Sequence, residues 1–153
     1  MSFIIEKIKE LGYELPDVPK PVASYIPAIR AGNIVYTSGM LPMSNGKIIY
    51  AKEIGGIQNS INYGYKAAEL CALNVLSVLN DFVGLDNIEQ IIKVTGYVNS
   101  ASGFADQSKV VNGASDLLVK IFGEKGKHVR AAIGVSELPL SASVEIDMIV
   151  QLK

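Results

Sequence analysis

Apolar residues recur at helical spacing in several segments of the chain. The longest, residues 58–83, carries an apolar or small side chain at every third or fourth position, which predicts a long amphipathic helix. A second helix is predicted over residues 104–123, and a short one begins after Ser2 and ends at Gly12. The positions predicted to face inward in the two longer helices are Ile61, Tyr65, Ala68, Ala72, Val75, Leu79, Phe82, Val110, Ala114, Leu117 and Ile121.

The last segment of the chain, residues 142–152, alternates strictly between apolar and other residues and therefore predicts a strand. One face carries an apolar stripe made of Val144, Ile146, Met148 and Val150. The opposite face carries Glu145 and Asp147 together with Ile149. Helices are expected to cover only the apolar stripe, so the second face meets either water or another subunit.

The remaining strands follow from shorter patterns. Turn residues at 31–33 join two strands, and the Asn-Gly pair in residues 44–47 predicts a second hairpin turn. Strands are also predicted over residues 91–99 and 129–136. The resulting order is β-β-β-α-β-α-β-β, which indicates an α+β fold with two helices on one face of a mixed sheet.

Composition favours a subunit on the second sheet face. The chain of 153 residues is 49% hydrophobic and 19% charged, against about 25% charged in a typical soluble domain. A closed ring of copies buries such a face most simply. Lys and Arg number 14 against 15 Asp and Glu, so no nucleic-acid partner is expected. No continuous apolar stretch is long enough to span a membrane, so no membrane association is expected.

Cysteine and histidine each occur once, as Cys71 and His128. A lone cysteine excludes an internal disulfide and fits a reducing compartment, so we expect a cytoplasmic protein. One residue of each kind also makes a zinc site improbable. In the helical pattern Cys71 falls on the inward side and is expected to be an inert core thiol. His128 is expected to be a solvated loop residue, because no serine or aspartate pattern accompanies it.

Three stretches resemble the Rid/YjgF family of reactive-intermediate (enamine/imine) deaminases, also called the L-PSP endoribonuclease family. They are SYIPAIRAGNIVYTSGMLP, GLDNIEQIIKVTGYV and RAAIGVSELPLSASVEIDMIVQL. The resemblance covers residues 21–153 as one domain and leaves residues 1–20 as an N-terminal helix with a proline-rich extension. It implies a chorismate-mutase-like fold and a homotrimer with an inner β-barrel, outer helices and ligand clefts between subunits. It implies no cofactor and no metal.

The resemblance also implies roles for individual residues. Arg130 falls on the arginine that clamps a substrate carboxylate, and Glu145 on the glutamate that helps hold the hydrolytic water. A guanidinium suits the first role because its planar fork binds a carboxylate through two hydrogen bonds. Other residues that fall on cleft positions are Tyr25, Ser38, Gly39, Asn112 and Ala132. Ala132 replaces the family's usual cysteine and would contribute its backbone carbonyl, so a thiol-dependent role is excluded.

Three functions remain open at the level of sequence. The first is hydrolysis of 2-imino or enamine acids of the 2-aminoacrylate class to 2-oxo acids and ammonia. The second is non-catalytic binding of small 2-oxo acids in the same cleft, since fold does not dictate function. The third, an endoribonuclease, is disfavoured by the acidic pI of about 5.8.

The site residues also have purely structural interpretations. Arg130 fits a cation that pairs with a surface carboxylate, and Glu145 fits a solvated or interface charge. Tyr25 fits an amphipathic packing residue.

Overall fold

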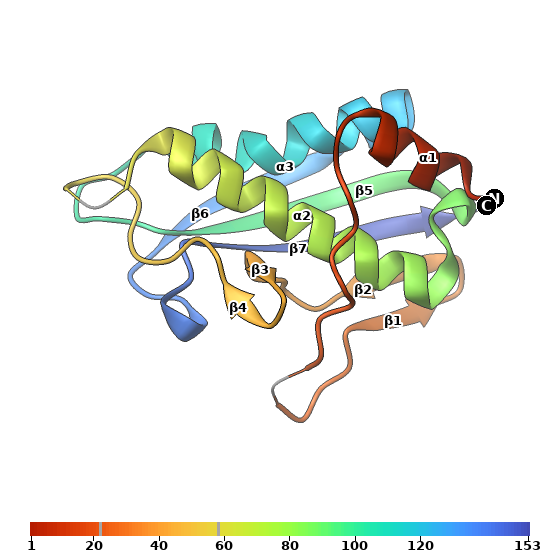
Figure 1. Ribbon diagram of the computed structural model, residues 1–153, viewed down its shortest axis with the longest axis horizontal. Helices are drawn as coiled ribbons and strands as arrows, with labels where there is room; N and C mark the ends of the chain where they lie inside the picture. Colours follow the sequence, from red (N-terminus) through yellow and green to blue (C-terminus); the bar gives the residue numbers. More distant parts are fainter. Residues whose placement is uncertain (22, 58) are drawn as a thin grey trace.

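The computed structural model describes residues 1–21, 23–57 and 59–153, and its centre is a five-stranded mixed sheet (Figure 1). In chain order its strands are β1 (Ala28–Ala31), β2 (Ile34–Thr37), β5 (Ile88–Asn99), β6 (Val129–Val135) and β7 (Val144–Leu152). Their spatial order is β1-β2-β7-β5-β6, with β5 and β6 parallel and every other pair antiparallel. The predicted α+β class is confirmed.

Helices α1 (Phe3–Glu10), α2 (Ile61–Val83) and α3 (Gln107–Phe122) lie on one side of this sheet (Figure 1). The Ser60 side chain caps α2 by accepting a hydrogen bond from the Tyr63 backbone N–H. The two long helices pack closely, since a side chain at Gly113 of α3 would collide with the Tyr65 carbonyl oxygen of α2. Short 3₁₀ turns at Leu85–Asn87, Gly123–Gly126 and Pro139–Ser141 connect the elements.

The core lies between these helices and the sheet. Burial alternates without exception along β7, and its even-numbered residues from Val144 to Val150 are at most 1% exposed, as the sequence pattern predicts. Most predicted inward positions of α2 and α3 are also buried. Phe82 is different, at 46% exposed, because it lies in the last turn of α2. Helical spacing identifies a face but not where along that face the packing partner ends.

The predicted hairpin at residues 44–47 forms a small sheet of its own, consisting of β3 (Met43–Ser44) and β4 (Lys47–Ile48). Asn45 and Gly46 both have positive φ angles, 52° and 74°, as this turn type requires. This hairpin stands apart from the main sheet. It gives four strands before α2 in the described part of the chain, where the predicted order has three, because the segments on both sides of the Asn45-Gly46 turn pair with each other.

None of the described helices covers the sheet face opposite to α1, α2 and α3 in the single chain. Large apolar side chains on it are 43–65% exposed: Ile29, Tyr36, Val129 and Ile133. Strand pairing places Ile29 opposite Tyr36 and Tyr36 opposite Ile149, so apolar groups sit side by side across strands. An apolar face of this kind is typical of an interface.

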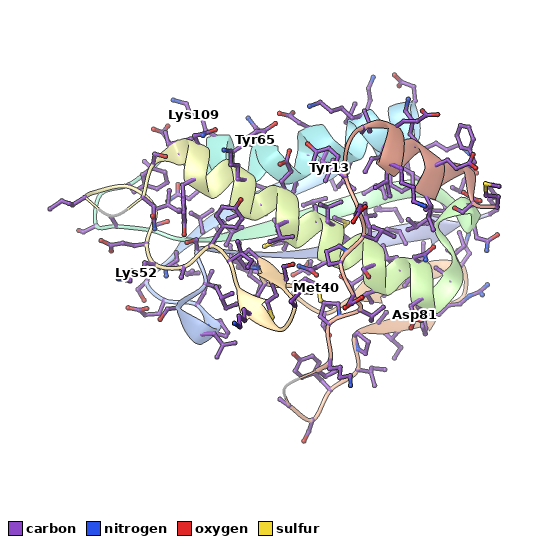
Figure 2. All side chains as sticks on the ribbon, in the orientation of Figure 1. Tyr13, Met40, Lys52, Tyr65, Asp81 and Lys109 are labelled. Atoms are coloured by element: carbon purple, nitrogen blue, oxygen red, sulfur yellow. The ribbon has the colours of Figure 1, made fainter. Side chains whose placement is uncertain are left out.

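The N-terminal segment runs from α1 across α2 toward β1 (Figure 1). It is held by hydrogen bonds from the Tyr13 hydroxyl to Glu69 (2.7 Å) and from the Ser77 hydroxyl to the Pro16 carbonyl (2.5 Å). Figure 2 labels Tyr13 beside α2, with Tyr65 nearer α3. Burial and then Glu69 raise the pKa of Tyr13 to about 12, so this phenol stays a donor. Within the described ranges, no helix is long and apolar enough to cross a membrane.

Candidate functional site

Arg130 lies on β6, an edge strand that pairs in parallel with β5 after a crossover through α3. Its guanidinium turns toward α3. Nη1 donates to Asn112 Oδ1 (2.8 Å) and Ser115 Oγ (3.2 Å), and Nη2 donates to the Ser108 carbonyl (3.3 Å). Among the described residues, no carboxylate oxygen lies within 4.0 Å of this cation. The surface ion pair considered from the sequence is therefore not formed.

The partners of Arg130 share one face of α3. Ser108, Asn112 and Ser115 follow one another at helical spacing of four and then three residues, which brings them into line. Asn112 is the only one of these identified from the sequence. The polar stripe opposite the apolar stripe of the same helix is the signal that could have revealed Ser115, whereas Ser108 contributes only its backbone carbonyl, which residue type does not reveal. Together they hold a half-buried cation with neutral oxygen acceptors.

His128 is not the solvated loop residue that the sequence suggested. It is half-buried, with Nε2 2.8 Å from Ser115 Oγ and Nδ1 2.6 Å from the Gly126 carbonyl oxygen. Burial lowers its pKa, and the charge of Arg130 lowers it further, although the Gly126 carbonyl opposes both. The serine partner escaped detection because it lies on another element, α3, and is adjacent only in space.

Glu145 lies on the opposite face of the sheet. Its neighbours in β7, Val144 and Ile146, are fully buried under the helices, so the alternation of the strand turns Glu145 the other way. Burial raises the pKa of the Glu145 carboxyl, and the nearby Asp147 raises it further. Asp147 accepts a hydrogen bond from the Tyr97 hydroxyl (3.1 Å). A carboxyl group whose pKa is raised in this way is better matched to proton transfer near neutral pH.

Gly39 lies directly against Glu145. A Cβ atom on Gly39 would come within 2.8 Å of Glu145 Cδ, so only glycine leaves the carboxyl group where it is. Gly39 and Tyr25 line the same cavity of about 140 Å³, together with Met40 and Pro139. Next to Gly39, the Ser38 hydroxyl donates to the Ile26 carbonyl (2.7 Å), which fixes the chain at the end of β2. Figure 2 labels Met40 below α2, near β2.

The expected site residues thus form two separate clusters. Glu145 lies against Gly39, which shares a cavity with Tyr25 and follows Ser38 in the sequence, whereas Arg130 is bonded to Asn112. Ala132 packs against the core along the same strand as Arg130. Strand pairing places Arg130 beside Val94 of β5 and Val94 beside Met148 of β7. Met148 lies three residues from Glu145 along β7. Neighbouring strands lie about 4.8 Å apart, and each residue advances about 3.3 Å along its strand. Two strand spacings across the sheet and three residues along it therefore place the Arg130 and Glu145 backbones roughly 14 Å apart. Because their side chains also point to opposite faces, one chain does not bring them together.

The chemistry available at the clusters is that of hydrogen bonding and proton transfer. In the part of the chain that the structure describes, no three histidine, cysteine, aspartate or glutamate side chains gather as metal ligands. Arg130 provides a permanent cation with neutral supports, and Glu145 a carboxyl group with a raised pKa. These groups suit a site in which Arg130 binds an anionic substrate and Glu145 holds a water molecule.

Comparison with known proteins identifies one family. Residues 6–152 match the sequence model of the family described as YjgF/chorismate mutase-like. The same description also suggests an endoribonuclease. Protein TCP17 of Trypanosoma cruzi is 36% identical over 97% of this chain and 94% of that protein. A crystal structure of a protein of unknown function from Agrobacterium tumefaciens is 41% identical, with a TM-score of 0.91 over 98% of this chain and 92% of that chain. A 2-iminobutanoate/2-iminopropanoate deaminase of Dermatophagoides farinae is 26% identical over 90% of this chain and 93% of that protein.

Proposed function

Because the chain belongs to the Rid/YjgF family, we propose that it hydrolyses 2-imino acids of the 2-aminoacrylate class to 2-oxo acids and ammonia, without a cofactor. The observation that carries this proposal is Arg130, a half-buried cation with no carboxylate partner among the described residues. A relative of similar length named as a 2-iminobutanoate/2-iminopropanoate deaminase supports the substrate class.

In the proposed reaction Arg130 binds the substrate carboxylate and leaves the C=N carbon beside Glu145. The Glu145 carboxylate removes a proton from water as the water oxygen bonds to that carbon, giving a tetrahedral carbinolamine. Glu145 returns this proton to the substrate nitrogen, and the hydroxyl proton follows it to nitrogen as the carbon–nitrogen bond breaks, so that ammonia leaves and the carbonyl forms. The raised pKa of Glu145 favours both transfers, since the group must accept the proton and give it back.

The site we propose lies between two copies of the chain. Arg130 and Asn112 come from one copy, and Tyr25, Ser38, Gly39 and Glu145 come from its neighbour. The support for this arrangement is the separation of the two clusters and the exposed apolar residues Val129 and Ile133 on the uncovered face of β6. A homotrimer closes such a head-to-tail contact into a ring. Sedimentation equilibrium at micromolar concentration should give three times 16.4 kDa; a stable monomer would remove the proposed cleft.

The activity is tested by generating imino acids with an amino-acid oxidase and comparing 2-oxo acid release with that in buffer. Arg130→Ala should lower kcat/KM about 10- to 150-fold, the effect of losing charge-assisted hydrogen bonds of roughly 1.5–3 kcal/mol. Arg130→Lys should recover part of it, since an ammonium lacks the planar fork. Arg30 provides a matched control, because within the described part of the chain the only partner of this exposed β1 arginine is the Gly32 carbonyl of its own turn. Arg30→Ala should leave kcat/KM unchanged.

Other outcomes identify other functions. No acceleration of imine hydrolysis, with 2-oxo acids still raising the melting temperature of the wild type but not of Arg130→Ala, would indicate a binder that does not turn over substrate. RNA cleavage that survives repurification and the Arg130→Ala substitution would support an endoribonuclease instead. A structural arginine would be revealed if Arg130→Ala lost assembly and Arg130→Lys restored it.

A further inference from the structure

A continuous chain of hydrogen bonds lies behind Arg130. Its Nη1 donates to Ser115 Oγ at 3.2 Å, Ser115 Oγ lies 2.8 Å from His128 Nε2, and His128 Nδ1 lies 2.6 Å from the Gly126 carbonyl oxygen. These groups come from β6, from α3 and from the turn that joins them. The chain of contacts therefore ties the two ends of the crossover to the cation.

The groups at the two ends of this hydrogen-bond series, Arg130 and the Gly126 carbonyl, fix which atom donates in each of its hydrogen bonds. The Gly126 carbonyl oxygen only accepts, so His128 Nδ1 carries a proton. A guanidinium only donates, so Ser115 Oγ accepts from Arg130. In the neutral imidazole, Nε2 is then an acceptor, and it takes the single hydroxyl proton of Ser115. Because burial and the nearby Arg130 lower the pKa of His128, the ring is neutral at pH 7 and this arrangement holds.

The same contacts select the edge of the guanidinium that a ligand meets. An arginine side chain has five N–H donors. Asn112 and Ser115 take both donors of Nη1, and the Ser108 carbonyl takes one of Nη2. Among the residues that the structure describes, the donors left without a partner are Nε–H and one N–H of Nη2, which lie on neighbouring nitrogens and match the two oxygens of a carboxylate.

We propose that His128 is a positioning residue for Arg130: by holding the Ser115 proton, it makes Ser115 present a lone pair to Nη1 and so turns the Nε/Nη2 edge toward the substrate carboxylate. That the Nε/Nη2 edge of Arg130 binds the substrate carboxylate rests on the proposed function. The positioning itself is a property of the unliganded protein. His128 does not touch the substrate in this scheme and acts through Ser115.

A purely structural role for His128 would work through Gly126 instead, by pinning the turn before β6. Two substitutions separate these roles. Asn carries its side-chain N–H at the distance of Nδ1, so His128→Asn retains the bond to Gly126 and loses the one to Ser115. Gln carries its oxygen at the distance of Nε2, so His128→Gln retains the acceptor for Ser115 and loses the bond to Gly126. Ser115→Ala removes the link and serves as the reference for complete loss.

The measurements are the dissociation constant for pyruvate by calorimetry, KM and kcat for imine hydrolysis, melting temperature and size. His128→Asn and Ser115→Ala should weaken pyruvate binding and raise KM by about 3- to 10-fold, the range of one neutral hydrogen bond. The value of kcat should stay within about twofold, because the carboxylate clamp acts equally in ground and transition states. His128→Gln should bind pyruvate like the wild type. Equal losses in Gln and Asn, or wild-type binding in Asn, would overturn the proposal.

A readout without ligand separates this inference from the proposed function. In nitrogen NMR spectra, the neutral His128 ring should be protonated at Nδ1, and the Arg130 Nη1 and Nη2 signals should be resolved because rotation of the guanidinium is slow. These signals should remain resolved in His128→Gln and merge in His128→Asn and Ser115→Ala. If that pattern appears but the wild type neither binds pyruvate nor hydrolyses imines, the proposed function fails and the positioning stands. Identical Arg130 signals in all variants would overturn the positioning, whatever the ligand results.

Discussion

Substituting Gly39 by alanine gives a direct test of the place assigned to Glu145. The new Cβ would lie 2.8 Å from Glu145 Cδ and 3.0 Å from Oε2. Carbon atoms pack at about 3.5–4.0 Å, so the carboxyl group must retreat by about 0.7–1.2 Å. Gly39 is not among the positive-φ glycines, which means that alanine fits its backbone conformation. The strain is therefore confined to the flexible end of one side chain.

A displacement of this size should affect activity far more than stability. Moving a catalytic group by about 1 Å lowers rates by about 100-fold, which corresponds to roughly 2.7 kcal/mol in the barrier. The melting temperature should change little, because the Glu145 carboxyl group has no ion-pair partner among the described residues that would be lost. The oxidase-coupled assay for 2-oxo acid release measures kcat/KM, and thermal melting with sizing measures fold and assembly.

A double-mutant cycle shows whether the effect runs through Glu145. In the Glu145→Ala background the added methyl group meets no carboxyl group, so Gly39→Ala should cost nothing further. Full additivity would instead mean that the methyl group acts on the 140 Å³ cavity that Gly39 shares with Tyr25. Wild-type activity of Gly39→Ala would refute the role of Glu145 in the reaction.

Two further outcomes follow from burial. Cys71 is fully buried, and burial raises the pKa of its thiol well above the ordinary value, so soluble thiol reagents should modify it slowly; rapid labelling of the native protein would contradict the orientation of α2. Burial and Asp147 raise the pKa of Glu145, and a raised carboxyl pKa means stability that is present at acid pH and lost as pH rises through the folded value. Glu145→Gln should therefore melt higher than the wild type at pH 7, while imine hydrolysis is lost. The gain should vanish below about pH 4.5, the ordinary value, and a gain that increased on acidification would disprove the assignment.

Local patterns determined much of this fold. Strict alternation over residues 142–152 identified β7 and put Glu145 on the face away from Val144, because side chains of a strand alternate whatever it pairs with. Helical spacing likewise identified α2 and α3 and the burial of Cys71. These properties depend on neighbours a few residues away, which the sequence displays directly. Family resemblance added Arg130 and Glu145 as candidates, and their roles stay predictions.

What the sequence left open was which segments meet. Ser115 and His128 lie on different elements, and Gly39 meets Glu145 only because Met40 pairs with Ile146 of β7. Such contacts depend on strand register and on the crossover through α3, and neither is encoded in local periodicity. The same is true of the opposite orientations of Arg130 and Glu145. The sequence thus determined the residue types and the face of each element on which they lie. Tertiary packing decided that the candidate site is divided between two surfaces, because strand pairing in the folded sheet sets which face of β6 and which face of β7 lie on the same side.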